Sequence, residues 1–220
     1  MANNGMQQRV AGRWLSASPV REVDRSKTYY HGTPRASSAQ AILRDGVIKP
    51  PDVVSKAFLA PVKGRVYMTP TLSYAAIYAM GGAMAGHTWP PEHIKAEPLG
   101  YLFSIAGKDL LDIQPDEDSI GELLFEGDAP SWLVALGRRH LSKTVWQKGQ
   151  QGEYMYYAKA GKTLLGHMSD DQKLALVDMG AHIAASAEVP FQHCWEFPKN
   201  RSQDLEKDGS NFFSLCRQIR

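Results

Sequence analysis

The chain has 220 residues, a formal net charge of +2 at pH 7 and a pI near 8.5. Apolar residues make up 43% and charged residues 22%, a balance that is typical of globular proteins and excludes a chain disordered throughout. The weak positive charge permits an anionic partner without requiring one. Cys194 and Cys216 are its only cysteines, too few for a disulfide framework or a cysteine-rich metal site. We find no membrane-length apolar run and no apolar signal core in 1–10, and therefore expect a cytoplasmic protein.

Short strands and helices alternate along the predicted chain. Residues 1–26 are polar and predict an N-terminal arm. The clearest helix starts are Thr69-Pro70 and Ser169, and Gly46 marks the clearest helix end. We expect strands at 27–32, 65–68, 101–105, 110–113 and 153–158, and helices at 37–44, 69–80, 131–140 and 169–188. Loops are expected at 47–63, 83–98 and 141–151. This order predicts an α+β fold, with short strands around a cleft and helices at its sides.

Three separated patches carry side chains suited to one chemistry. The first is His31-Gly32-Thr33, at the end of the first predicted strand. A glycine there lets the backbone approach a planar ligand, and its N–H and C=O can pair with a carboxamide. Histidine and threonine side chains can bond ribose hydroxyls. Taken alone, the tripeptide is more often an ordinary turn.

The second patch is Tyr67, with Tyr78 eleven residues later. Tyr67 is expected at the end of a strand and Tyr78 two turns into the following helix, so that both rings face one gap. Aromatic rings on either side of a cationic pyridinium gain about 1 kcal/mol each from stacking and cation–π attraction. Tyr74, one helical turn before Tyr78, is read as an ordinary packed aromatic.

The third patch is Gln151-Gly152-Glu153-Tyr154. A carboxylate at the start of the strand expected at 153–158 would lie at a cleft edge. It could bind a ribose hydroxyl and stabilise positive charge on the ribosyl carbon as nicotinamide leaves. By itself, a solvated glutamate is the commoner reading.

In this order the three patches resemble the ADP-ribosyltransferase superfamily, specifically the His–Tyr–Glu branch that contains diphtheria toxin and the poly(ADP-ribose) polymerases. The resemblance covers about 27–160 as ordered patches, and it implies a split β-sheet core around an NAD cleft. It predicts an arm at 1–26, a catalytic core at 27–165 and a C-terminal helical extension at 166–220, packed on the core. In many members of the branch a serine stands where this chain has Ala75, so its contact with the nicotinamide amide would be missing.

The resemblance assigns a role to each matching residue. NAD would be the cosubstrate, and no metal is implied. Glu153 would be catalytic, with His31 and Tyr67 supporting it. The NAD-binding set would be His31, Gly32, Thr33, Tyr67 and Tyr78, where Gly32 holds the amide and the two tyrosines enclose the ring.

The acceptor is less narrowly predicted. In many members the residue two before the glutamate contacts the acceptor, and an acidic residue there goes with arginine acceptors. Gln151 disfavours arginine, since its amide suits an amide or a nucleobase edge. The preceding stretch mixes cations with an aromatic ring, which suits a phosphate backbone and an unstacked base. The predicted acceptor-binding residues are therefore Gln151, Trp146, Lys148 and Arg139, with a slight preference for nucleic acid over protein.

The resemblance thus predicts a mono-ADP-ribosyltransferase that modifies an intracellular macromolecule as a toxin or defence effector, with 162–220 as a plausible docking surface for an antitoxin. Three alternatives stay open: a protein acceptor, an NAD-dependent RNA 2′-phosphotransferase, and a non-catalytic module that binds NAD or ADP-ribose. The 2′-phosphotransferases rely on paired arginines around their histidine, which this pattern does not supply. His87 and His93 lack further metal ligands nearby, and 116–118 is read as a solvated turn.

Overall fold

A computed structural model describes residues 26–50, 64–81, 97–127, 129–186, 188–199, 213–214 and 216–220. They divide into two compact units. The helical unit contains residues 114–183, and the sheet unit contains the described residues of 24–113 and 184–220. Helices and antiparallel sheets are both present, which confirms the α+β prediction. Of the arm expected at 1–26 and the loops expected at 47–63 and 83–98, residues 1–25, 51–63 and 83–96 lie outside the described residues, and residues 47–48 form a short strand instead of a loop.

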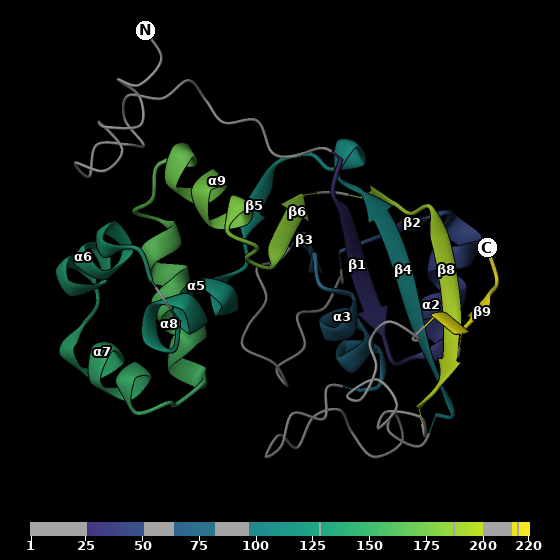
Figure 1. Ribbon diagram of the computed structural model, residues 1–220, viewed down its shortest axis with the longest axis horizontal. Helices are drawn as coiled ribbons and strands as arrows, with labels where there is room; N and C mark the ends of the chain where they lie inside the picture. Colours follow the sequence, from purple (N-terminus) through teal and green to yellow (C-terminus); the bar gives the residue numbers. More distant parts are fainter. Residues whose placement is uncertain are drawn as a thin grey trace, which may run out of the picture. The chain divides into compact units, whose positions relative to one another are not determined.

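The main sheet of the sheet unit has four strands in the order β1-β4-β8-β9 (Figure 1). These strands are β1 (Thr28–Thr33), β4 (Leu99–Ala106), β8 (His193–Pro198) and β9 (Arg217–Gln218), and all neighbours are antiparallel. A second sheet pairs β2 (Val47–Ile48) with β7 (Val189–Pro190). A third has the order β3-β6-β5, formed by β3 (Arg65–Met68), β6 (Ile183–Ser186) and β5 (Ile113–Pro115). The chain passes from one unit to the other within β5 and β6.

Helix α3 (Leu72–Ala79) lies directly on the main sheet because two strand residues carry no side chain. A Cβ at Gly32 of β1 would overlap the carbonyl oxygen of Ala75, and a Cβ at Gly100 of β4 would lie 2.6 Å from that of Ala79. The facing helix residues are small too, and they pack with Leu102 in one buried cluster. Backbone therefore touches backbone here, as close packing of a helix on a sheet requires.

Helix α2 (Ala36–Asp45) follows β1 and lies behind the main sheet in the view of Figure 1. It ends as predicted at Gly46, whose φ of 75° is the left-handed conformation that glycine adopts without steric cost. Its first N–H, that of Ala36, donates to the Glu97 carboxylate at 2.7 Å. A carboxylate from a distant segment thus caps the helix in place of a local side chain.

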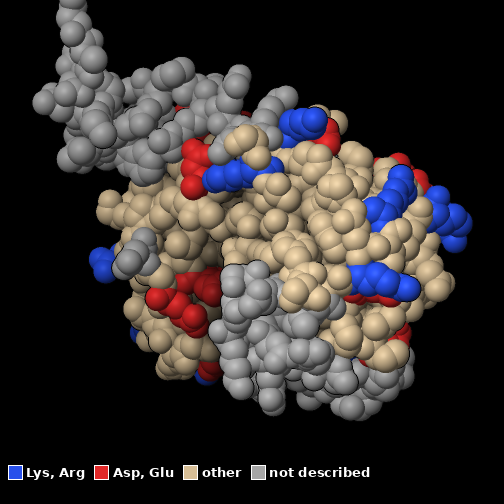
Figure 2. All heavy atoms as spheres, turned by 45° about the vertical axis from the view of Figure 1, so that its right-hand side comes forward, with Lys and Arg blue, Asp and Glu red and all other residues tan. Residues whose placement is uncertain are grey.

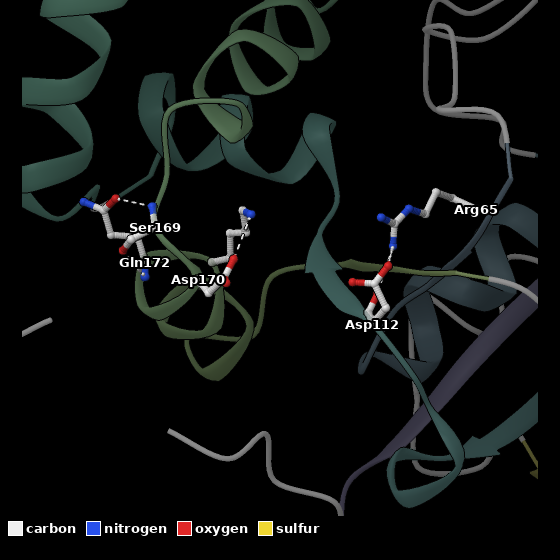
Figure 3. A network of polar contacts seen from close by, with 6 residues as sticks. Arg65, Asp112, Ser169, Asp170 and Gln172 are labelled. Carbon is white, nitrogen blue, oxygen red and sulfur yellow. Dashed lines mark hydrogen bonds and ion pairs between the residues drawn. The ribbon is translucent and has the colours of Figure 1, made fainter. Parts of the chain in front are cut away.

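The described residues of the helical unit form five helices: α5 (Glu117–Phe125), α6 (Ser131–His140), α7 (Lys143–Gln150), α8 (Met155–Leu165) and α9 (Asp170–Asp178). Helices α5 and α8 touch through glycine, since a Cβ at Gly121 would meet the backbone of Tyr157 and one at Gly161 would meet that of Glu117. Helix α9 starts at a capping box, in which Ser169 and Gln172 bond each other's backbone (Figure 3). This confirms Ser169 as a helix start.

Several predicted elements are wrong in this unit. The strand expected at 153–158 and the connection expected at 141–151 are helices α8 and α7, and the turn at 116–118 opens α5. Tyr154–Tyr157 favours extended structure locally, but the buried residues of α8 follow the i, i+3, i+4, i+7 spacing of a helix: Tyr157, Ala160, Gly161 and Leu164. Tertiary packing therefore decides the conformation over local propensity.

The C-terminal part of the chain also differs from the expected helical extension at 166–220. The helix predicted at 169–188 ends at Asp178, and β6, β7, β8 and β9 follow. Three of these strands, β6, β7 and β8, pair with strands that come before residue 107, and the described residues from 184 onward belong to the sheet unit. The helices at 37–44 and 131–140 and the strands at 65–68 and 101–105 are confirmed, within one or two residues at each end. No helix in the described part of the chain is long and apolar enough to cross a membrane.

The contact between α3 and β1 can be tested by adding one methyl group. Gly32→Ala should lower the free energy of unfolding by about 1–3 kcal/mol, because the new Cβ must displace helix backbone. Chemical denaturation followed by circular dichroism measures the loss. Gly166→Ala is the control: its φ is −69° and its added Cβ would have only an ordinary contact, 3.6 Å from the Thr163 oxygen. It should change stability by less than about 0.5 kcal/mol. Equal stabilities for the two variants would contradict the close approach.

Candidate functional site

The structure brings the first two sequence patches together in the sheet unit. His31 lies on β1, and its Nδ1–H donates to the carbonyl oxygen of Tyr67 on β3 at 2.9 Å. Because a carbonyl can only accept, this bond assigns the proton of a neutral imidazole to Nδ1 and leaves Nε2 as an acceptor. The ring also lies 6.5 Å, centroid to centroid, from Phe103 on β4. His31 is thus oriented by a bond to a strand backbone and by an aromatic neighbour.

The charge of His31 follows from its surroundings. Burial lowers the pKa of His31 below its ordinary value of 6.5, and the hydrogen bond to the Tyr67 carbonyl opposes this in part. At neutral pH the imidazole is therefore uncharged. A neutral ring offers its Nε2 lone pair to a hydroxyl group, as binding of a ribose would require.

Gly32 presents its backbone at the edge of β1. In an antiparallel pair, residues alternate between those bonded to the partner strand and those whose N–H and C=O point away. The Tyr30 N–H donates to the Thr69 carbonyl and the Tyr30 carbonyl accepts from the Thr69 N–H. Tyr30 therefore belongs to the residues whose backbone groups point away from β4. Gly32 is two residues further along and belongs to the same set. Its N–H and C=O therefore point to the side of β1 away from β4, in the arrangement that a planar carboxamide would pair with.

The other predicted NAD-binding residues also lie in the sheet unit. Tyr67 is half-buried between Val66 and Met68, which are buried and point to the other face of β3. Tyr78 is half-buried on α3, with its ring 5.7 Å from that of Tyr74. That Tyr67 and Tyr78 enclose a flat ring stays a prediction.

Two residues of these patches serve the fold directly. Thr33 is buried at the end of β1, and its hydroxyl accepts from the N–H of Arg35 at 3.5 Å, where the chain turns into α2. Ala75 stands where a serine is often found in the His–Tyr–Glu branch. It is buried on the side of α3 that faces the sheet, with its carbonyl against Gly32. A contact between Thr33 and a ribose stays a prediction.

Glu153 lies elsewhere, in the helical unit. It stands in the turn between α7 and α8, and Gly152 before it has a φ of 76°. Its carboxylate forms an ion pair with Lys148, and both side chains are about two-fifths exposed. The ion pair raises the pKa of Lys148. The position predicted for Glu153, at the start of a strand, is therefore wrong, and a neighbouring ammonium partly neutralises its charge.

The predicted acceptor-binding residues differ in their surroundings. Trp146 packs into the helical unit: its ring is edge-on to Phe125 at 5.8 Å and lies against Gly137 of α6. It is a packed side chain rather than a platform for a base. Lys148 is held by Glu153, whereas Gln151 and Arg139 are exposed.

One carboxylate that the sequence prediction passed over is Glu188. It directly precedes β7, so it is a glutamate at the start of a strand in the sheet unit. Three residues later, Phe191 packs edge-on against Phe103 at 5.0 Å, and Phe103 is the aromatic neighbour of His31. The Glu188 side chain is 60% exposed, and its carboxylate lies 3.8 Å from the Lys49 ammonium. Glu188 was missed from the sequence because it was placed at the end of a helix expected at 169–188. The strand-like run Val189-Pro190-Phe191 could have indicated that a strand begins after it.

Acidic residues also gather at the start of α5, without forming a metal site. Burial and neighbouring carboxylates raise the pKa of Asp116 well above its ordinary value and that of Asp118 to about 7. Among the residues that the structure describes, no group of three His, Cys, Asp or Glu could hold a metal ion. These carboxylates serve as the helix start, where the Asp116 side chain accepts from the Asp118 N–H.

Charges in the sheet unit are largely matched. Figure 2 shows one face, on which cationic side chains lie beside acidic ones in several places. Ion pairs join Arg44 to Asp45 and Arg217 to Glu196. Arg65 binds both the carboxylate and the carbonyl of Asp112 at 2.9 Å (Figure 3), and Asp112 is the one non-glycine residue with positive φ in the described part of the chain.

Comparison with known proteins adds no assignment. No family model matches the chain, no curated protein matches its sequence, and no solved structure matches its fold. The functional argument therefore depends on the chain's own residues.

The environment of His31 predicts how stability depends on pH. Since folding lowers its pKa, the unfolded chain binds more protons below pH 6.5. The stabilisation is complete above that pH and is lost as the pH falls through the folded pKa. Between pH 7 and 5, His31→Gln should therefore lose less unfolding free energy than the wild type, by at most about 1.4 kcal/mol per pH unit for one proton.

Urea titrations at several pH values measure the difference. The pKa of His182 is also lowered, to about 4, by burial. His182 is present in both proteins, so its contribution cancels when the two are subtracted. Parallel pH curves for wild type and His31→Gln would show that His31 titrates alike in the folded and unfolded states.

Proposed function

We propose that the protein is an NAD-dependent ADP-ribosyltransferase whose NAD-binding residues lie in the sheet unit. The observation that carries this proposal is the pair His31-Gly32 on β1. One residue offers a neutral imidazole acceptor, and the next offers a backbone N–H and C=O at the strand edge. Nicotinamide carries a carboxamide and a ribose on one ring, so adjacent groups of these two kinds match its two ends.

The residues around this pair fit the same ligand. The backbone carbonyl of Tyr67 is hydrogen-bonded to His31, and Tyr78 belongs to α3, the helix that packs on Gly32. The amide would bond the Gly32 backbone, the tyrosine rings would stack on the pyridinium, and His31 would accept from a ribose hydroxyl. Together these contacts fix the glycosidic bond relative to the protein, as cleavage requires.

Bond cleavage also needs an anion near the ribosyl carbon, because positive charge develops there as nicotinamide leaves. Glu153 was predicted for this role, but its carboxylate forms an ion pair with Lys148. We assign the role to Glu188, a glutamate of the sheet unit that directly precedes β7; Phe191, three residues later, packs on Phe103, the ring neighbour of His31. Nicotinamide leaves with the electrons of the glycosidic bond. The ribosyl cation then forms a bond to the acceptor nucleophile, which loses a proton.

The alternatives differ from this proposal in what happens to NAD. A non-catalytic module would bind NAD and release no nicotinamide. An RNA 2′-phosphotransferase would remove a 2′-phosphate from RNA in an NAD-dependent reaction. A toxin or defence setting, with an antitoxin and either a nucleic-acid or a protein acceptor, remains part of the proposal only as an expectation from the resemblance.

Two matched carboxylate variants test the assignment. Glu188→Gln should lower nicotinamide release from NAD by about 100-fold or more, because an amide cannot stabilise the developing cation. Glu153→Gln should stay within about threefold of wild type. Release is measured by chromatography with labelled NAD, with and without cellular RNA, DNA and protein. Asp109→Asn, an exposed carboxylate in the same unit as Glu188, is the control for loss of charge.

The possible outcomes separate the hypotheses. Loss of activity in Glu153→Gln alone would return the catalytic role to Glu153. NAD binding without nicotinamide release from the wild type, under all acceptor conditions, would leave the non-catalytic module. Removal of a 2′-phosphate from RNA without stable transfer of label would identify the phosphotransferase.

A further inference from the structure

A group of cations in the helical unit is not used by the proposed NAD site. Three of them end α6, namely Arg138, Arg139 and His140, and Lys143 begins α7 after two intervening residues. His167, from the turn between α8 and α9, joins them: its ring stacks on that of His140, with centroids 3.8 Å apart and planes 17° apart. We call these five residues the basic corner.

The positive charge of the basic corner is not compensated. In the described part of the chain, none of its five side chains forms an ion pair with a carboxylate. Two other cations of the same unit do, since Lys148 pairs with Glu153 and Lys173 with Asp170. Arg138, Arg139, Lys143 and His167 are exposed, and His140 is half-buried.

Helix electrostatics explain only part of this gathering. Cations in the last turn of α6 are stabilised by the negative end of its dipole. His167 follows the C-terminal end of α8, where a cation is also favoured, but Lys143 is at the positive end of α7, where a cation is disfavoured. His167 and Arg139 both act to lower the pKa of His140, which burial lowers first. The corner thus concentrates positive charge at an electrostatic cost that an anionic partner would remove.

The side-chain types indicate which anion. Arg138 and Arg139 offer planar guanidinium groups, which bind phosphate through two parallel hydrogen bonds. The stacked imidazoles add an exposed flat ring, a group on which unpaired bases stack. Cations beside a flat ring suit a single-stranded nucleic acid, whereas an acidic peptide would use the charges alone.

We propose that the basic corner binds single-stranded nucleic acid, with Arg138, Arg139 and Lys143 on phosphates and the His140–His167 stack against a base. A role for this strand as the ADP-ribose acceptor rests on the proposed function; the binding itself does not. Trp146 and Lys148, which the sequence placed in such a surface, are held inside the helical unit and in an ion pair. The binding surface is therefore narrower than predicted and includes His167, distant in sequence.

The test is fluorescence anisotropy of a labelled 20-nucleotide single-stranded RNA of mixed sequence, titrated with the full chain at several salt concentrations without NAD. Arg138→Gln with Arg139→Gln should weaken binding at 0.1 M salt by about tenfold. The slope of log K against log salt should fall by about 1.4 if each arginine neutralises one phosphate. Lys159→Gln with Lys162→Gln is the control, since it removes two exposed cations of α8 outside the corner. It should change affinity less than twofold.

Lys143→Gln provides an independent variant should the double arginine variant fold poorly, and thermal melts check both. Wild-type affinity should rise as the pH falls from 7.5 to 5.5, because protonation of His140 adds charge, and His140→Asn should flatten this rise. The inference would be overturned if the double arginine variant and the double lysine variant lost equal RNA affinity. It would also be overturned if polyglutamate displaced the RNA at equal charge concentration, which would favour an acidic peptide.

RNA binding without nicotinamide release would contradict only the proposed function. Nicotinamide release without RNA binding would contradict only the basic corner.

Discussion

The arrangement of the candidate site depends on one close contact, that of the α3 backbone with β1 at Gly32. With no Cβ between them, the Ala75 carbonyl lies against the strand. The same glycine has its N–H and C=O at the strand edge, so one residue both seats the helix and exposes the backbone groups. Tyr78 is carried by that helix, and its distance from β1 is therefore set by the absence of a side chain at position 32. A larger residue would move the helix and the aromatic ring together.

His31 extends this constraint to β3. Its bond to the Tyr67 carbonyl ties two strands that belong to different sheets, and it fixes which ring nitrogen is available. A half-buried imidazole could satisfy Nδ1 through water, but a bond to strand backbone holds the ring in one orientation at lower entropic cost. Arg65, at the start of the same strand, binds the Asp112 turn just before β5. Both ends of β3 are thus anchored by polar side chains.

The sequence predicted the first strands of the sheet unit better than the helical unit or the strands after residue 183, for a physical reason. Around His31 and Tyr67, local propensity and tertiary structure agree: strand formers lie in strands, and Gly46 ends a helix. At 153–158 they conflict. The aromatic run favours a strand by itself, yet its burial against α5 through Gly121 and Gly161 requires a helix. Contacts between residues 36 or more apart decide this, and no local pattern reports them. Glu188 was hidden for the same reason.

The connections between the two units bear on how the functions could be divided. The helical unit begins within β5 and ends within β6, and these strands are neighbours in one sheet. Its residues therefore form an insertion whose two ends lie close together, as is common for tolerated domain insertions. The sheet unit completes its own strands from the segments on either side. In the proposed function the NAD-binding groups lie in the sheet unit, whereas the cations of the basic corner lie in the helical unit. Such a division lets the insertion change its partner without disturbing the contact of α3 with β1.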